Sequence, residues 1–182
     1  FYRGYAYIER KKYEEAAYEF GLLLKRNSEK YKIPAHYYYG YSQYRLENYS
    51  VALENILLAE NDPNFKEETP LLLCRLYFLL DNCEKSTEYA KKIIASGEIK
   101  KDKAEVYKIL AVCKFNNKEY ANTIDLLENY QKLSRKMTRE DWYVLGMSYY
   151  NTEKYDKAVK TLAKSTNEKD KLGQNSYFHT AM

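Results

Sequence analysis

A spacing of about 35 residues recurs along the whole chain, and this periodicity limits the possible folds more than any other feature. Five small residues stand 36, 34, 37 and 35 positions apart: Gly4, Gly40, Cys74, Ala111 and Gly146. Self-similarity with a period of roughly 20–50 residues is typical of repeat proteins, in which each repeat buries its apolar face against its neighbours. The fold is therefore expected to consist of about five copies of one small unit.

Further positions recur in the same register. Nine residues after each small residue stands a tyrosine or, once, a cysteine; three further on stands a small or compact residue, and four beyond that an apolar one. In the fifth copy these residues are Tyr155, Ala158 and Leu162. Alternating small and large side chains allow two helices to interlock at close range.

Each copy contains two apolar-periodic stretches separated by a short polar turn, as in residues 37–46 and 51–59. This arrangement predicts a helical hairpin. Asparagines such as Asn48 and Asn82 stand in the turns, where we expect them to adopt the left-handed conformation that ends a helix. The chain has only 6 glycines and 3 prolines, which disfavours the many turns of a β-sandwich or barrel.

Helix-start signals support the hairpins. Pro34 and Pro70 suit the first turn of a helix. Thr69 is expected to cap the helix that contains Pro70, and Thr138 with Asp141 predicts a capping box.

These units resemble tetratricopeptide repeats, whose pattern over about 34 residues is W-x-x-L-G-x-x-Y, then an aromatic, then A-x-x-x-F. The fifth copy carries the pattern at Trp142, Leu145, Gly146, Tyr149, Tyr155, Ala158 and Leu162. The third departs from it, with Cys74, Cys83 and Ser86 where the family favours Gly, Tyr and Ala. The resemblance covers nearly the whole chain, and it implies an all-α fold, a right-handed superhelical solenoid of helix-turn-helix repeats.

We expect a single solenoid over residues 1–182, with about five units and the start of a sixth. The expected units are 1–32, 33–66, 67–100, 101–136 and 137–172, with a partial unit at 173–182. Phe1 falls inside the pattern of a first helix, and the last residues read as a first helix without its partner. We therefore expect a fragment of a longer bacterial array, with Tyr177 and Phe178 on an exposed apolar surface.

The family resemblance also implies where a partner binds. In tetratricopeptide arrays the first helices line a concave groove, and certain places of each unit face it. The corresponding residues here, which are rich in aromatics, are Tyr5, Tyr37, Tyr41, Tyr44, Arg75, Phe78, Lys108, Phe115, Tyr143, Met147 and Tyr150. Because tyrosine offers a large contact area with few rotors and a hydroxyl, we expect this groove to bind an extended or helical protein segment, oriented by Arg75 and Lys108.

Helix-spaced aromatics can also belong to the core, and the groove residues could instead pack against adjacent units. The tyrosines expected in the core are Tyr7, Tyr13, Tyr49, Tyr77, Tyr120, Tyr149 and Tyr155. One subgroup of the family grips a C-terminal carboxylate with Lys and Asn side chains. Here Tyr37 and Tyr41 stand at those places, so this mode of binding is not expected.

Catalysis, metals and cofactors are not predicted. His36 and His179 are separated by about four units, and neither has a serine or cysteine at nucleophile spacing. There is no Gly-rich phosphate loop. The three cysteines lack metal-ligand spacing, so we interpret them as small buried hydrophobes without a disulfide framework. The chain is therefore expected to be a non-catalytic protein-interaction scaffold.

Nucleic acid and membrane are not expected partners. Lys and Arg number 30 against 26 Asp and Glu, and the groove positives Arg75, Lys108 and Arg45 are too few to track a phosphate backbone. No apolar run approaches the roughly 20 residues that span a bilayer. The alternative function is a structural spacer or self-assembly segment that associates through uncapped ends.

The setting is suggested by resemblance alone. Long arrays rich in tyrosine and lysine are similar to bacterial repeat proteins of the cell envelope, which favours the envelope or periplasm. Unbridged cysteines favour the cytoplasm as the alternative.

Overall fold

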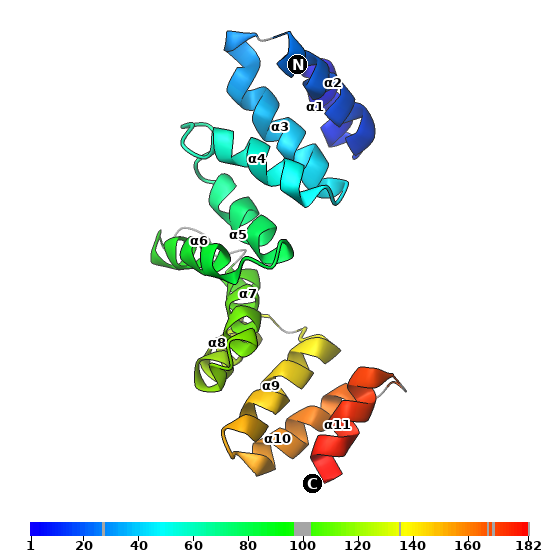
Figure 1. Cartoon of the computed structure of the whole chain (residues 1–182), viewed down its shortest axis with the longest axis vertical. Coiled ribbons are helices and arrows are strands. Elements are labelled where there is room, and N and C mark those ends of the chain that lie inside the picture. The colour runs from blue at the N-terminus through cyan, green and yellow to red at the C-terminus, as the bar shows by residue number, and fades with distance from the viewer. Residues whose placement is uncertain (27, 97–102, 135, 167, 169, 182) are drawn as a thin grey trace. The chain divides into compact units, whose positions relative to one another are not determined.

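The computed structural model describes residues 1–26, 28–96, 103–134, 136–166, 168 and 170–181. Within these residues every regular element is a helix, which confirms the all-α helical repeat (Figure 1). The chain divides into two compact units, Phe1–Lys92 and Ile93–Met182, and each is described by itself. The expected repeat boundaries remain predictions, and the junction expected at residues 100 and 101 lies outside the described residues.

The first unit consists of helical pairs in which each helix packs on the next along the chain. Its elements are α1 (Tyr2–Glu9), α2 (Tyr13–Lys25), the 3-10 helix η1 (Glu29–Tyr31), α3 (Lys32–Arg45), α4 (Tyr49–Ala59), α5 (Thr69–Leu79) and most of α6 (Cys83–Ser96). Besides these consecutive contacts, α1 also touches α3. The first helices of the first two pairs, α1 and α3, therefore lie next to each other.

The second unit follows the same plan. Its elements are α7 (Lys103–Asn116), α8 (Tyr120–Leu133), α9 (Arg139–Asn151), α10 (Tyr155–Leu162), the 3-10 helix η2 (Ala163–Ser165) and α11 (Lys171–Ala181). Helices α7 and α9 touch, as do α9 and α11. The core between α8 and α9 contains Leu127, Tyr130, Leu145 and Tyr149.

The predicted interlocking of small and large side chains is confirmed. A Cβ atom added to Gly40 would lie 2.9 Å from Cγ1 of Ile56, and one added to Gly146 would lie 2.6 Å from Cγ of Leu162. Ile56 and Leu162 are fully buried. The missing side chain therefore lets the two helices of a pair approach to a distance that a methyl group would prevent.

The left-handed residue that ends each first helix is not the predicted asparagine. It is the residue two positions before the recurring aromatic or cysteine, with φ between 57° and 63°: Lys11, Glu47, Asp81, Lys118 and Glu153. At the second hairpin the N–H of Glu47 donates to Tyr44 O at 3.1 Å, and the N–H of Asn48 donates to Gln43 O at 2.9 Å. This is the hydrogen-bond pattern of a Schellman cap, and Asn48 instead precedes the first residue of α4.

The helix starts agree with prediction in one case and differ in another. Thr138 and Asp141 form the predicted capping box of α9. Thr69 does not cap α5, because Glu68 occupies the cap position and Thr69 Oγ1 donates to the carbonyl of Phe65 at 2.9 Å. The hydroxyl thus ties α5 to the connector that precedes it.

Two expectations about side chains need correction. Tyr155, expected in the core, is 56% exposed because it opens α10 at the surface. Cys83 and Cys113 are disulfide-bonded, so the expectation of unbridged thiols is wrong for these two. Tyr177 and Phe178 are 60% and 61% exposed, as predicted.

Candidate partner-binding site

All the predicted groove residues lie on first helices of the pairs. Tyr5 is on α1; Tyr37, Tyr41 and Tyr44 are on α3; Arg75 and Phe78 are on α5; Lys108 and Phe115 are on α7; Tyr143, Met147 and Tyr150 are on α9. Three of these residues line one pocket in the first unit, and Tyr150 lines a pocket in the second.

The pocket in the first unit, here called the tyrosine pocket, is formed by helices far apart in the sequence. It is lined by Tyr5, Ile8 and Glu9 of α1, by Tyr37, Tyr38 and Tyr41 of α3, and by Asn64, Phe65 and Glu68 of the connector between α4 and α5. Helices α1 and α3 touch, which brings their residues to one surface.

Aromatic contacts order the side chains that line the tyrosine pocket. The ring of Tyr37 stacks on Phe65 with centroids 4.1 Å apart and 16° between the planes. Tyr38 meets both Tyr5 and Tyr37 edge to face, at 5.3 Å and 5.2 Å. Such pairs hold rings in defined orientations. The pocket therefore presents an ordered aromatic surface.

The connector places Phe65 through local hydrogen bonds. Asp62 Oδ1 accepts from the backbone N–H of Asn64 at 2.9 Å, and the N–H of Phe65 donates to Asp62 O at 2.9 Å. Thr69 Oγ1 then closes on Phe65 O. As a result Phe65 is only 7% exposed, although it lies outside any helix.

The charge of the tyrosine pocket is negative. Among the described residues that line it, Glu9 and Glu68 are the charged ones. Burial raises the pKa of the Tyr37 hydroxyl, and the charge of Glu68 raises it further. The pKa of Tyr38 is also raised, first by burial and then by Tyr5, Glu68 and Glu9. Both carboxylates therefore act electrostatically on the hydroxyls of the pocket.

An arginine binds the other side of Tyr41. The guanidinium of Arg45 lies 4.4 Å from the ring centroid of Tyr13 and donates to the hydroxyl of Tyr41 at 3.2 Å. Tyr44 lies next to this group, with its ring centroid 6.5 Å from that of Tyr41. Arg45 is thus engaged by tyrosines and does not line the pocket.

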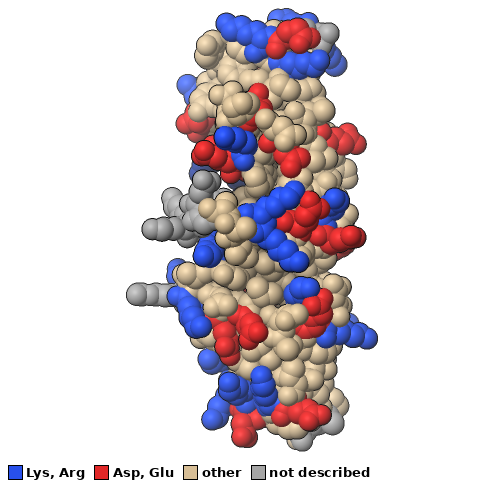
Figure 2. Space-filling model, turned by 90° about the vertical axis from the view of Figure 1, so that its left-hand side faces the viewer, with Lys and Arg blue, Asp and Glu red and all other residues tan. Residues whose placement is uncertain are grey.

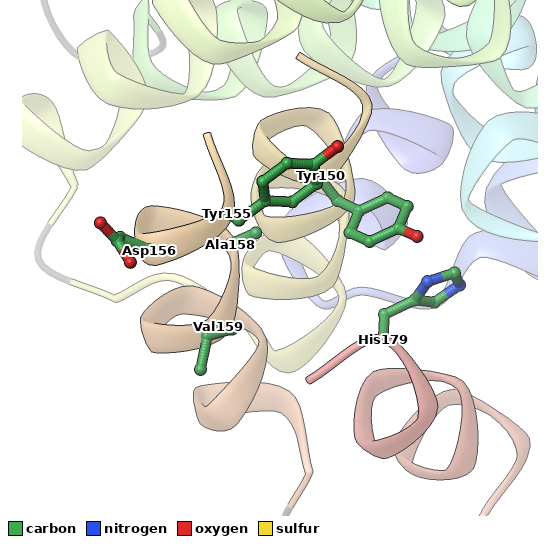
Figure 3. A pocket seen from close by; sticks show the side chains of 6 residues that line it. All are labelled: Tyr150, Tyr155, Asp156, Ala158, Val159 and His179. Carbon is green, nitrogen blue, oxygen red and sulfur yellow. The ribbon is translucent and has the colours of Figure 1, made fainter. Parts of the chain in front are cut away.

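The pocket in the second unit has fewer aromatic lining residues than the tyrosine pocket. Tyr150 lines it together with Tyr155, Asp156, Ala158, Val159 and His179. The ring of Tyr150 lies 5.7 Å from that of Tyr155 and 4.8 Å from the imidazole of His179. Figure 3 shows these three rings gathered together, whereas the carboxylate of Asp156 points away from them. Tyr143 and Met147, expected beside Tyr150, do not line this pocket.

Lys108 has a structural partner. Its Nζ lies 2.8 Å from Oδ1 of Asp141, a carboxylate whose side chain is only 3% exposed, and 6.0 Å from the ring centroid of Tyr130. Its charge is therefore engaged inside the second unit. The other predicted residues, Arg75, Phe78 and Phe115, are half-buried.

Sequence reasoning missed several residues of the tyrosine pocket. Phe65, Asn64 and Glu68 lie in a connector, to which the repeat pattern assigns no function. Glu9 occupies one of the groove-facing places of the first repeat, so the pattern could have identified it. Tyr38 lies next to the predicted Tyr37, but the groove pattern assigns only one of the three consecutive tyrosines at 37–39 to the groove.

Within the described ranges there is no group of three or more His, Cys, Asp or Glu residues able to hold a metal ion. None of the helices described is both long and apolar enough to cross a bilayer. On the face shown in Figure 2, basic and acidic side chains are interspersed rather than gathered by sign.

Comparison with known proteins places this geometry in context. The protein-family model described as subunit 3 of the anaphase-promoting complex, or cyclosome, matches residues 84–165 of this chain. No curated protein matches. A crystal structure of MamA protein is 16% identical with a TM-score of 0.71, covering 89% of this chain and 85% of that one.

Two further solved structures are similar. The C-terminal part of a TPR repeat-containing protein from Cytophaga hutchinsonii is 15% identical with a TM-score of 0.69, covering 98% of this chain and 68% of that one. A chain of the APC/C hetero-tetramer Cut9-Hcn1 is 20% identical with a TM-score of 0.63, covering 98% of this chain and 34% of that one.

An all-α array of paired helices of this kind is generally a protein-interaction scaffold. The fold of this chain is that of a tetratricopeptide-repeat array.

Proposed function

We propose that this chain binds a peptide or helix of a protein partner through the aromatic residues of its first helices, with the tyrosine pocket as the principal contact in the first unit. The observation that carries the proposal is the convergence of Tyr5, Tyr37 and Tyr41 on one pocket. The family resemblance implies these residues one repeat at a time, and the packing of α1 and α3 brings them together.

The side chains suit recognition physically. Tyr5 is 39% exposed, and the stacked Tyr37 loses little further freedom when a partner binds. Ordered aromatics that keep a hydroxyl at the surface are enriched among the residues that dominate binding energy. This favours binding over a purely structural role for these tyrosines.

The test is a selection of random-sequence peptides displayed on phage against the immobilised chain, followed by fluorescence anisotropy with single labelled peptides. Tyr5→Ala should weaken binding by about tenfold, since truncating an aromatic contact residue commonly costs more than 1 kcal/mol. Tyr18→Ala is the matched control, because Tyr18 is 66% exposed on the second helix α2 and does not line the pocket.

Circular dichroism of both variants should match the wild type, since both side chains are exposed. Equal loss of affinity in the two variants, or peptides that bind Tyr5→Ala as tightly as the wild type, would contradict the proposal that the tyrosine pocket is the binding site. Failure to select any binding peptide would favour the alternative described next.

The alternative is self-association, and it is supported by two exposed aromatics. Tyr177 and Phe178 are adjacent on α11 and each is about 60% exposed. Large exposed apolar groups that lie together commonly mark an interaction surface. In that case the chain would act as an assembly or spacer element.

A compartment outside the reducing cytoplasm is also proposed. Disulfides persist mainly in oxidising compartments, and the bonding of Cys83 and Cys113 supports such a setting. The test is mass spectrometry of the protein from its own source, alkylated before and after reduction. Alkylation of Cys83 and Cys113 without reductant would contradict this proposal.

A further inference from the structure

We infer that the tyrosine pocket takes a basic side chain, arginine in preference to lysine, from the partner segment. The inference rests on the proposed function and adds the chemistry of the group that occupies the pocket. It depends on two carboxylates, Glu9 and Glu68, that share the pocket with five aromatic side chains.

The two carboxylates have no cationic partner of their own. Neither Glu9 nor Glu68 forms an ion pair with any residue of the described ranges, whereas Glu19 and Glu88 in the same unit are paired with Arg3 and with Lys85. The nearest guanidinium on α3, that of Arg45, is bound by Tyr13 and Tyr41. The negative charge of the pocket is therefore not neutralised from within.

This charge selects among possible occupants. An anionic side chain would be repelled by two carboxylates. A purely apolar side chain would remove water from Glu9 and Glu68 without giving them a hydrogen-bond partner, which is unfavourable. A cationic side chain gains charge-assisted hydrogen bonds and also attraction to the faces of the rings.

The geometry favours arginine over lysine. A guanidinium is planar, stacks on aromatic rings and donates several hydrogen bonds at once, whereas an ammonium is a compact and strongly hydrated charge. The chain already uses this chemistry at Arg45, which stacks over Tyr13 while donating to Tyr41. In the tyrosine pocket the stacked pair Tyr37 and Phe65 provides the corresponding surface.

The test uses the phage-selected peptides. Those retained by the wild-type chain should be enriched in arginine and lysine relative to the library. For the tightest peptide, replacing its basic residue by glutamine should weaken binding about fivefold, because the change removes its ion pairs with two exposed carboxylates. Replacing arginine by lysine should weaken binding less, and added salt should weaken wild-type binding.

The test variant and its control each remove two negative charges. Glu9→Gln with Glu68→Gln should bring the parent peptide and its glutamine version to within about twofold of each other. The control, Glu54→Gln with Glu67→Gln, removes two exposed carboxylates that do not line the pocket and should leave the wild-type preference intact.

The outcomes separate the inference from the proposed function. Peptides that need Tyr5 but show no basic enrichment, or that bind Glu9→Gln/Glu68→Gln as tightly as the wild type, would overturn the inference and leave the binding function standing. If no selected peptide depends on the tyrosine pocket, both are wrong.

Discussion

Replacing Gly146 by alanine is expected to destabilise the second unit, although alanine is the better helix former. A Cβ atom at this position would lie 2.6 Å from Leu162 Cγ, 2.7 Å from its Cδ2 and 3.1 Å from its backbone nitrogen. Favourable contact between carbon atoms begins at about 3.5 Å. Because a branched carbon and a backbone atom stand in the way, α9 and α10 must separate.

The magnitude follows from two opposed effects. Overpacking a buried contact costs about 1–3 kcal/mol, whereas the gain in helix propensity from glycine to alanine is about 1 kcal/mol. With contacts this short the cost lies in the upper part of its range. We expect a net loss of about 1–2 kcal/mol.

Gly21→Ala provides the matched control. A Cβ atom there meets only Cε2 of Tyr39, at the ordinary contact distance of 3.5 Å. The propensity gain then acts alone, so this variant should be stabilised by about 0.5–1 kcal/mol.

Urea unfolding measures both changes, with far-UV circular dichroism for the two variants and fluorescence for Gly146→Ala. Trp142, the only tryptophan of the chain, lies on α9 and reports on the second unit. Adding Leu162→Ala should reduce the penalty of Gly146→Ala, because the two residues are in contact. A Gly146→Ala variant as stable as the wild type would refute the packing argument.

Four further outcomes are expected. Thr138→Ala removes half of the capping box of α9 and should cost about 1 kcal/mol in urea unfolding, whereas Thr138→Ser should be near neutral. Lys118→Gly should stabilise the chain by up to about 1 kcal/mol, because Lys118 is left-handed, whereas the neighbouring Glu119→Gly should not. Arg139 lowers the pKa of Asp170 to about 2 from 3.8, so the stability that this pair adds is present above about pH 4 and is lost as the pH falls toward 2. The melting temperature of Asp170→Asn should therefore be lower than that of the wild type at neutral pH and equal to it near pH 2. Tyr177→Ser with Phe178→Ser should abolish any dimer seen by light scattering, whereas Tyr18→Ser should not; a dimer that persists would exclude α11 as the contact.

The helical hairpins and their interlocking could be predicted from the sequence. Side-chain size at Gly40 and Ile56, or at Gly146 and Leu162, recurs at a fixed separation, and within a hairpin that separation sets which residues meet. The capping box of α9 was also predictable, because Thr138 and Asp141 are three residues apart and act locally.

The turn was predicted in place but not in detail. Asparagine has the higher intrinsic preference for the left-handed conformation, yet Glu47 and Lys118 adopt it. The position is imposed by the hydrogen bonds that close the first helix, as in the bond from Asn48 to Gln43. These bonds can outweigh the roughly 1 kcal/mol penalty of a residue with a side chain.

The repeat and the helical pairs can be predicted from the sequence, because they follow from periodicity and from contacts within one hairpin, and the resemblance of the repeats to a known family implies the candidate tyrosines Tyr5, Tyr37 and Tyr41. That these tyrosines share a pocket with Phe65, Glu9 and Glu68 follows from the tertiary structure alone. The path of the connector between α4 and α5 brings Phe65 onto Tyr37 and places Glu68 at the pocket, and packing of α1 on α3 adds Glu9. Such contacts join residues far apart in the chain, and no local pattern encodes them.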